Sequence, residues 1–205
     1  MHYHKLKLVL ILPVFLWIFL SGSIYAQAPD FDMKINQSKE TIDDLTYAGY
    51  STRFDISVES LQRMWWKHSK GLGIVENMKT HYIIKVPSRE KGMSPVSLIE
   101  KATGDEKSAT IFLAVLDQTN NTFKEQVRDV LLAFKVQYYV DQVAEKIRKK
   151  EQELAKVSND YVSMVSAAQK NGNSPNARQS KQSLDRMTRL SYELESLKRS
   201  LNQIQ

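Results

Sequence analysis

The sequence contains no cysteine, and this absence removes several kinds of chemistry at once. A chain without thiols forms no disulfide, offers no thiolate nucleophile and has no cysteine to carry a lipid anchor. An oxidising compartment permits disulfides without requiring them, because a chain of this length buries enough surface without them. The missing cysteine therefore excludes thiol chemistry, but it does not indicate whether the protein works in an oxidising or a reducing compartment.

Long hydrophobic runs are also missing. The longest uncharged apolar run, residues 8–20, has thirteen residues and contains Pro13, whereas a membrane-spanning helix needs about 20 apolar residues. The run follows a leader with Lys5 and Lys7 and precedes small residues around Ala26, which is typical of a secretory signal. We therefore predict a signal peptide over residues 1–26, with a retained membrane anchor as the alternative.

The expected cleavage site lies after Ala26. A cut after Ala28 would leave Pro29 as the first residue, and its fixed φ and missing N–H hinder an extended substrate conformation. The mature protein would begin at Gln27 and act in the periplasm or outside the cell. It would meet the membrane only through the transient signal peptide.

The net charge of +6 is unevenly distributed along the chain. Residues 27–121 hold 12 Lys and Arg against 13 Asp and Glu, whereas residues 122–205 hold 15 against 10. The basic excess of the second half is interspersed with acidic residues, as on a solvated helix, while a nucleic-acid site usually has a denser basic block. We therefore expect no nucleic-acid partner.

The first half of the mature chain predicts a small α+β head. Residues 27–47 are polar and weakly patterned, and we expect a flexible lead-in there. Alternating or continuous apolar residues predict about four strands within residues 48–121. The expected strands are 50–56, 74–86, 96–102 and 108–116. Between the first two, Ser57 can cap a helix that Gly71 and Gly73 end, and a hairpin surrounds Gly104.

The second half contains very little glycine or proline, and neither occurs between Phe123 and Asn171. This stretch predicts one helix of about 48 residues, with Thr122 and Glu125 forming a capping box at its start. Apolar residues then repeat every seven positions, and a second such run follows a turn at residues 171–176. The seam of the two runs consists of Val140, Val143, Ile147, Leu154, Val157, Met187, Leu194, Leu197 and Leu201.

Two heptad helices joined by a short turn are expected to fold back on each other. The predicted fold class is therefore α+β: a small, mainly antiparallel sheet of about four strands with one helix over residues 48–121. It is followed by a long antiparallel helical hairpin, a coiled coil, over residues 122–205.

Candidate catalytic groups are few, because the mature chain has only two histidines, His68 and His81. Together with a carboxylate such as Glu76 they make a conceivable zinc site. His68, however, lies on the apolar face of the expected helix, which favours a packed histidine. The sequence predicts no catalytic residue, no metal ligand and no cofactor, and a small hydrolase using one histidine is the least favoured alternative.

The residues that favour an interaction are aromatic or lie beside the heptad seam. Trp65 and Trp66 point about 100° apart on a helix, so one can be buried while the other lines the edge of the core or meets a partner. A two-helix hairpin buries only one stripe on each helix, and any surplus apolar residues need a partner. The candidate interaction surface consists of Trp66, Tyr161, Val162, Met164, Val165 and Leu190.

The layout over about residues 48–205, with the helical motif Met64-Trp-Trp-Lys67, resembles a recurrent type of exported bacterial protein. Such proteins combine a small α+β head with a long C-terminal helical segment, and the resemblance implies no known activity. The ingredients are also similar to those of Skp-type periplasmic chaperones, although here the strands all precede the helical pair. We predict a non-enzymatic exported protein that oligomerises or binds a protein partner through its hairpin, with a periplasmic holdase as the alternative.

Overall fold

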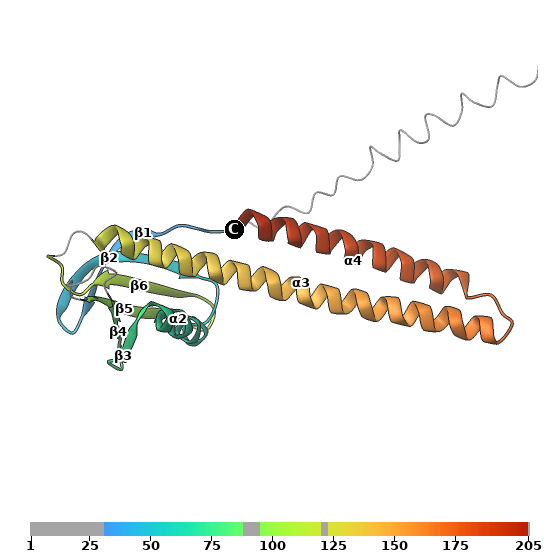
Figure 1. Ribbon diagram of the computed structural model, residues 1–205, viewed down its shortest axis with the longest axis horizontal. Coiled ribbons are helices and arrows are strands. Elements are labelled where there is room, and N and C mark those ends of the chain that lie inside the picture. The colour runs from blue at the N-terminus through green and yellow to red at the C-terminus, as the bar shows by residue number, and fades with distance from the viewer. Residues whose placement is uncertain (1–30, 88–94, 120–122, 205) are drawn as a thin grey trace, which may run out of the picture. The chain divides into compact units, whose positions relative to one another are not determined.

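The structure is a computed structural model that describes residues 31–87, 95–119 and 123–204 (Figure 1). The predicted signal peptide, its cleavage site and the Thr122 cap lie outside these ranges. In chain order the described elements are β1 (Asn36–Ile42), β2 (Leu45–Phe54), α2 (Val58–Leu72), β3 (Ile74–Asn77), β4 (Tyr82–Val86), β5 (Val96–Gly104), β6 (Ala109–Val115), α3 (Lys124–Lys170) and α4 (Ala177–Ile204). The protein is α+β, with an antiparallel sheet, a long helix and a further helix, as predicted.

The described strands form a six-stranded antiparallel sheet in the order β1-β2-β6-β5-β4-β3, so the expectation of about four strands is wrong. One additional strand is β1, which lies within the segment expected to be a flexible lead-in. The other arises because the expected strand 74–86 is two strands, β3 and β4, joined by a tight turn. Strand β6 is central, as its two apolar faces predict.

Both unexpected hairpins turn without glycine. Asp43 and Asp44 have φ values of 49° and 65°, the pair of positive angles that a two-residue type I′ turn requires. In the second turn Lys79 has a φ of 73° and donates its backbone N–H to Asn77 Oδ1 at 2.8 Å. The usual glycine signal for such turns is therefore absent from the sequence, which explains why the two turns were not predicted.

One face of the sheet packs against α2 and the first part of α3. Leu61 and Trp65 of α2 join Leu131 and Phe134 of α3 in a single buried cluster with strand residues. The Trp65 and Phe134 ring centroids lie 5.0 Å apart, and those of Phe54 and Phe134 lie 5.4 Å apart. Offset and edge-to-face aromatic contacts of this kind hold the two helices on the same side of the sheet.

The opposite face carries a smaller cluster of Ile42, Tyr47, Ile99, Phe112 and Ala114. The β1–β2 hairpin curls over this face. Lys101 Nζ of β5 lies 2.8 Å from Glu40 Oε1 of β1, although two strands separate them in the sheet order. The tip of the same hairpin reaches the β3–β4 turn, where His81 Nδ1 is 3.8 Å from Asp43 Oδ2. The edge strand thus covers part of the sheet's second face.

Helix α3 has 47 residues and α4 has 28. Gly172, at a φ of 66°, lies in the connection between them. Asn176 caps the N-terminus of α4, because its Oδ1 accepts hydrogen bonds from the backbone N–H groups of Arg178 and Gln179. The chain divides into two compact units. The described residues of 30–146 and 201–205 form the head unit, and the described residues of the other unit, here called the two-helix unit, are 147–200.

Candidate interaction surface

Ion pairs join α3 to α4 within the two-helix unit. Lys150 Nζ lies 2.6 Å from Glu193 Oε2, and Arg186 Nη2 lies 2.9 Å from Glu153 Oε1. The hydrogen bond to Glu193 raises the pKa of Lys150, and the hydrogen bond from Arg186 lowers the pKa of Glu153. All four side chains are partly exposed, so each pair contributes only about 0–1 kcal/mol to stability.

The two-helix unit buries one apolar stripe. Val157, Leu190 and Leu194 are 7%, 0% and 5% exposed. The other residues of the predicted seam in this unit are half-buried: Ile147, Leu154, Met187 and Leu197. The remaining seam residues lie in the head unit, where Val143 is buried and Val140 and Leu201 are half-buried.

The assignment of Leu190 to the interaction surface is wrong, because its side chain is fully buried. Its spacing gives the reason: it lies three residues after Met187 and four before Leu194, on the buried stripe itself. A residue that fills the space between two helices is not available to a third partner. Leu190 therefore contributes to folding of the unit.

The candidate surface residues of α3 differ in exposure. Val162 is 57% exposed, whereas Tyr161, Met164 and Val165 are half-buried. Sequence reasoning missed Leu184 and Tyr192 of α4, which are 47% and 73% exposed. The spacing of the buried stripe could have found Leu184. Stripe residues of α4 alternate three and four positions apart, so the next position before Met187 is 183, and Leu184 lies outside the stripe. Large apolar residues outside a stripe are the ones a partner can cover.

A groove of about 470 Å³ lies between the two helices of this unit. The α3 side supplies Val157, Asp160 and Met164, and the α4 side supplies Gln179, Gln182, Ser183 and Arg186. The residues recur three or four positions apart on each helix, so they share one side of the pair. The groove combines apolar groups with amide, hydroxyl, carboxylate and guanidinium groups.

Trp66 belongs to the head unit. It is half-buried on α2, where its ring contacts Tyr82 at 5.5 Å between centroids and Lys70 Nζ lies 4.8 Å from the ring centre. Its neighbour Trp65 is fully buried. The structure therefore places Trp66 at the edge of the head core, in a different unit from the candidate residues of α3.

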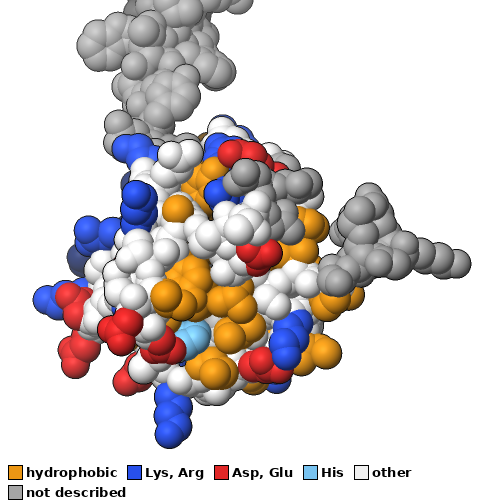
Figure 2. Space-filling model, turned by 90° about the vertical axis from the view of Figure 1, so that its left-hand side faces the viewer, with side chains coloured by type: hydrophobic (Ala, Val, Ile, Leu, Met, Phe, Trp, Pro, Cys, Tyr) orange, Lys and Arg blue, Asp and Glu red, His pale blue; other side chains and the backbone are white. Residues whose placement is uncertain are grey.

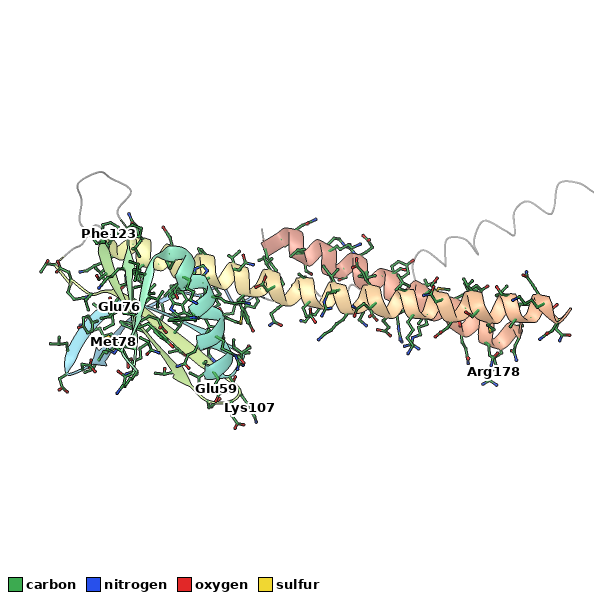
Figure 3. The ribbon with its side chains drawn as sticks, turned by 60° about the horizontal axis from the view of Figure 1, so that its bottom comes forward. Glu59, Glu76, Met78, Lys107, Phe123 and Arg178 are labelled. Carbon is green, nitrogen blue, oxygen red and sulfur yellow. The ribbon has the colours of Figure 1, made fainter. Side chains whose placement is uncertain are left out.

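The head unit has its own exposed apolar residues. Leu45, Ile74 and Met78 are 62%, 68% and 48% exposed. Figure 2 shows hydrophobic side chains gathered on the face of the head that is turned toward the viewer, with charged groups around them. In Figure 3, Glu76 and Met78 lie near each other at the β3 end of the sheet. Lys85 Nζ pairs with Glu76 Oε1 at 2.6 Å there.

The two histidines of the described chain lie in different surroundings. His68 contacts the rings of Trp65 and Phe134, and burial lowers its pKa. His81 is buried beside Thr80, whose Oγ1 lies 3.0 Å from its Nδ1. Glu76, the carboxylate considered with them, pairs with Lys85. Within residues 31–87, 95–119 and 123–204, no three histidine or carboxylate groups cluster as metal ligands.

No family model, no curated protein and no solved structure matches this chain. None of the helices in the described part of the chain is both long and apolar enough to span a membrane. The site must therefore be argued from its residues alone.

A cavity of about 380 Å³ in the head unit lies between β1, β2, the end of β6 and the start of α3. Tyr50 Oη donates to Glu125 Oε1 at 3.0 Å at this cavity, and Lys39 and Lys124 also line it. Gln118, which follows β6, contacts β2: its Oε1 accepts a hydrogen bond from the Ala48 backbone N–H at 3.0 Å. Glu125, expected as part of a helix cap, thus also ties α3 to β2.

Glu100 is the most unusual titratable group of the head. It lies on β5, is fully buried, and neither carboxylate oxygen has a hydrogen-bond partner among the described residues. Burial raises its pKa from 4.5 to about 8. It belongs to the sheet face covered by the two helices, since it is opposite Leu113 in the strand register. The signal that could have found it is its position directly after Leu98 and Ile99, two residues on from an apolar residue of the same sheet face.

Proposed function

We propose that this chain is a non-enzymatic exported protein that binds another protein through its two-helix unit. The observation that carries the proposal is the exposure of Val162, Leu184 and Tyr192 beside a single buried stripe. Isolated apolar residues on a surface are ordinary, but here three large ones lie among only 54 described residues of the unit. A covering partner would remove this surface from water.

The proposal includes an antiparallel coiled-coil hairpin. The ion pairs Lys150–Glu193 and Glu153–Arg186 support it, because the later residue of α3 pairs with the earlier residue of α4. The heptad spacing of the buried and half-buried stripe supports it as well. A hairpin of this kind presents two outer helix faces and the groove between them to a partner.

Export rests on the sequence. The basic leader, the apolar run of residues 8–20 and the small residues around Ala26 are the pattern of a cleaved secretory signal. N-terminal sequencing of the protein after expression with its own leader tests this part. A mature chain beginning at Gln27 is the expected result, and recovery of the protein with Met1 or His2 at its N-terminus would contradict it.

Crosslinking pull-down from the native cell envelope tests partner binding. One or two proteins recovered near stoichiometry are expected, and their recovery should fall strongly in the variant Val162→Ser, Leu184→Ser, Tyr192→Ser. The matched control is Leu45→Ser, Ile74→Ser, Met78→Ser, which removes exposed apolar groups from the head. This control should bind normally.

Two outcomes would change the assignment. A broad set of unfolded envelope proteins, in place of one or two, would favour a periplasmic holdase. A monomer that recovers no protein, or equal recovery by both triple variants, would contradict binding through the two-helix unit.

A further inference from the structure

Charge in the two-helix unit is separated along the helices. Residues 147–200 hold 11 Lys and Arg against 6 Asp and Glu. Four of those acidic residues lie at 151–153 and 193–195, away from the connection at 171–176. Three of the four, Glu151, Glu153 and Glu193, form ion pairs with basic residues. The end of the unit far from the turn is therefore largely neutralised by its own pairs.

The end with the turn is basic. Residues 156–189 hold six Lys and Arg and only two Asp. Four of these cations, Lys156, Lys170, Arg178 and Lys181, are exposed and form no ion pair in this fully described stretch. Figure 3 shows the side chain of Arg178 pointing away from the helices. With four unpaired cations against two aspartates, this stretch has a positive electrostatic potential.

The groove between α3 and α4 lies within this basic stretch. Its lining residues run from Val157 to Met164 on one helix and from Gln179 to Arg186 on the other. Gln179, Gln182 and Ser183 offer hydrogen-bond donors and acceptors suited to a polypeptide. Val157 and Met164 add apolar contact, and methionine adapts readily to different partner side chains. Asp160 and Arg186 also line the groove, and Arg186 is paired with Glu153, so the attraction for an acidic segment comes from the cations around the groove.

From this arrangement we infer that the groove docks an acidic segment of a partner protein, held by the cations of the turn end. The inference rests on the proposed function and specifies the partner's chemistry. A second copy of this chain fits less well, because it would bring one excess of positive charge against another. A lipid surface also fits less well, because a planar layer of headgroups does not enter a polar groove between two helices.

Binding to a labelled peptide of repeated Glu-Glu-Leu-Ser units tests the inference, with the purified exported form of the protein. The same peptide with Gln in place of every Glu is the ligand control. The acidic peptide should bind more tightly than the Gln peptide and weaken as salt is added, because exposed charges are screened. The variant K156Q, K170Q, R178Q, K181Q should bind about tenfold more weakly at low salt.

A matched variant controls for net charge. The changes K67Q, K79Q, K107Q and R128Q remove the same charge from exposed positions of the head and should leave binding unchanged. The variant S183W fills the groove without altering charge, and it should also weaken binding while helix content by circular dichroism stays constant. Together the two variants separate general electrostatic attraction from docking in the groove.

Several results would overturn the inference. They are no binding of the acidic peptide, equal binding of the Gln peptide, and equal losses in the two quadruple variants. Binding to vesicles of phosphatidylglycerol and phosphatidylcholine, without binding to the peptide, would assign the cations to a membrane surface instead. If a partner is still captured through Val162, Leu184 and Tyr192 in any of these cases, the proposed function stands and only the acidic segment is lost.

Discussion

Lys150 Nζ lies 2.6 Å from Glu193 Oε2 and 3.5 Å from Glu153 Oε2, so this lysine has a counter-ion from each helix. Lys150 lies three residues after Ile147 and four before Leu154, in line with the seam of α3. A lysine at a seam position normally weakens a coiled coil. Here its stem can cover the apolar stripe while its ammonium group reaches the two carboxylates at the edge. The pair thus lets a polar residue occupy the seam and marks one register of α3 against α4.

Replacing Lys150 with leucine should leave the two-helix unit as stable as the natural protein or more stable, by up to about 1 kcal/mol. The lost ion pairs involve side chains that are 34% and 40% exposed, and such pairs contribute about 0–1 kcal/mol. The leucine adds apolar contact along the stripe. Chemical denaturation followed by circular dichroism measures the change. Marked destabilisation would mean that the ion pairs matter more than their exposure indicates.

Two leucines of α4 should respond very differently to truncation. Leu190 is fully buried and Leu184 is 47% exposed. Leu190→Ala should destabilise the unit by about 2–5 kcal/mol, because it removes apolar contacts and leaves a cavity. Leu184→Ala should change stability by less than about 0.5 kcal/mol. Thermal melts of both variants make the comparison, and equal losses would show that Leu184 is also part of the folded packing.

Local sequence signals made the helices predictable. The absence of glycine and proline between Phe123 and Asn171 predicted a helix close to the observed Lys124–Lys170. Ser57 and Gly73 likewise bounded α2, since the Ser57 side chain accepts the N–H of Ser60 and the helix ends before Gly73. These signals are local and repeated, so tertiary contacts were not needed to read them.

Strand β1 could not be predicted in the same way. Its residues are mostly polar and exposed, because it is an edge strand that pairs on one side only. Its apolar contribution to the second face is essentially Ile42, at its last position. A strand held by backbone hydrogen bonds and one buried residue gives little alternation, and composition alone suggested flexibility.

The turn that ends β1 offers a direct test. Asp44 has a φ of 65°, in the left-handed region that costs a non-glycine residue about 1–2 kcal/mol. Asp44→Gly removes that cost and creates the favoured Asp-Gly turn, so stability should rise by about 1 kcal/mol despite the greater freedom of the unfolded chain. Asp44→Val should lower it. The denaturant midpoints of both variants measure these changes, and a glycine variant less stable than the natural protein would argue against a positive φ at residue 44.

The candidate surface was only partly readable from the sequence. A heptad pattern indicates which residues are buried, and by elimination which are not, but Leu190 shows that the pattern must be followed strictly. The unequal pairing of charges was hidden, because Lys150 and Arg186 cannot be told from Lys156 and Lys181 until their partners across the helix pair are known. Three-dimensional neighbours decide which cations remain free for a partner.

Glu100 makes the stability of the head depend on pH. Its pKa is 4.5 in the reference state and about 8 in the fold. Below pH 4.5 both states hold the proton, so the buried group carries no charge penalty. Between 4.5 and about 8 the unfolded chain releases the proton and the fold retains it, so stability falls by about 1.4 kcal/mol per pH unit. Above this window the loss is complete.

Glu100→Gln removes this titration, and its stability should therefore fall less than that of the natural protein between pH 5 and 8. The variant should be the more stable of the two at the upper end of that range, because there the natural carboxyl must stay protonated in the fold while it ionises in the unfolded chain. Denaturant unfolding monitored by tryptophan fluorescence, which reports on Trp65 in the same core cluster, measures both curves. Glu106→Gln, at an exposed position, is the control and should follow the natural protein. Parallel curves for the natural protein and Glu100→Gln would show that the carboxyl has a proton donor or cation beside it and titrates normally.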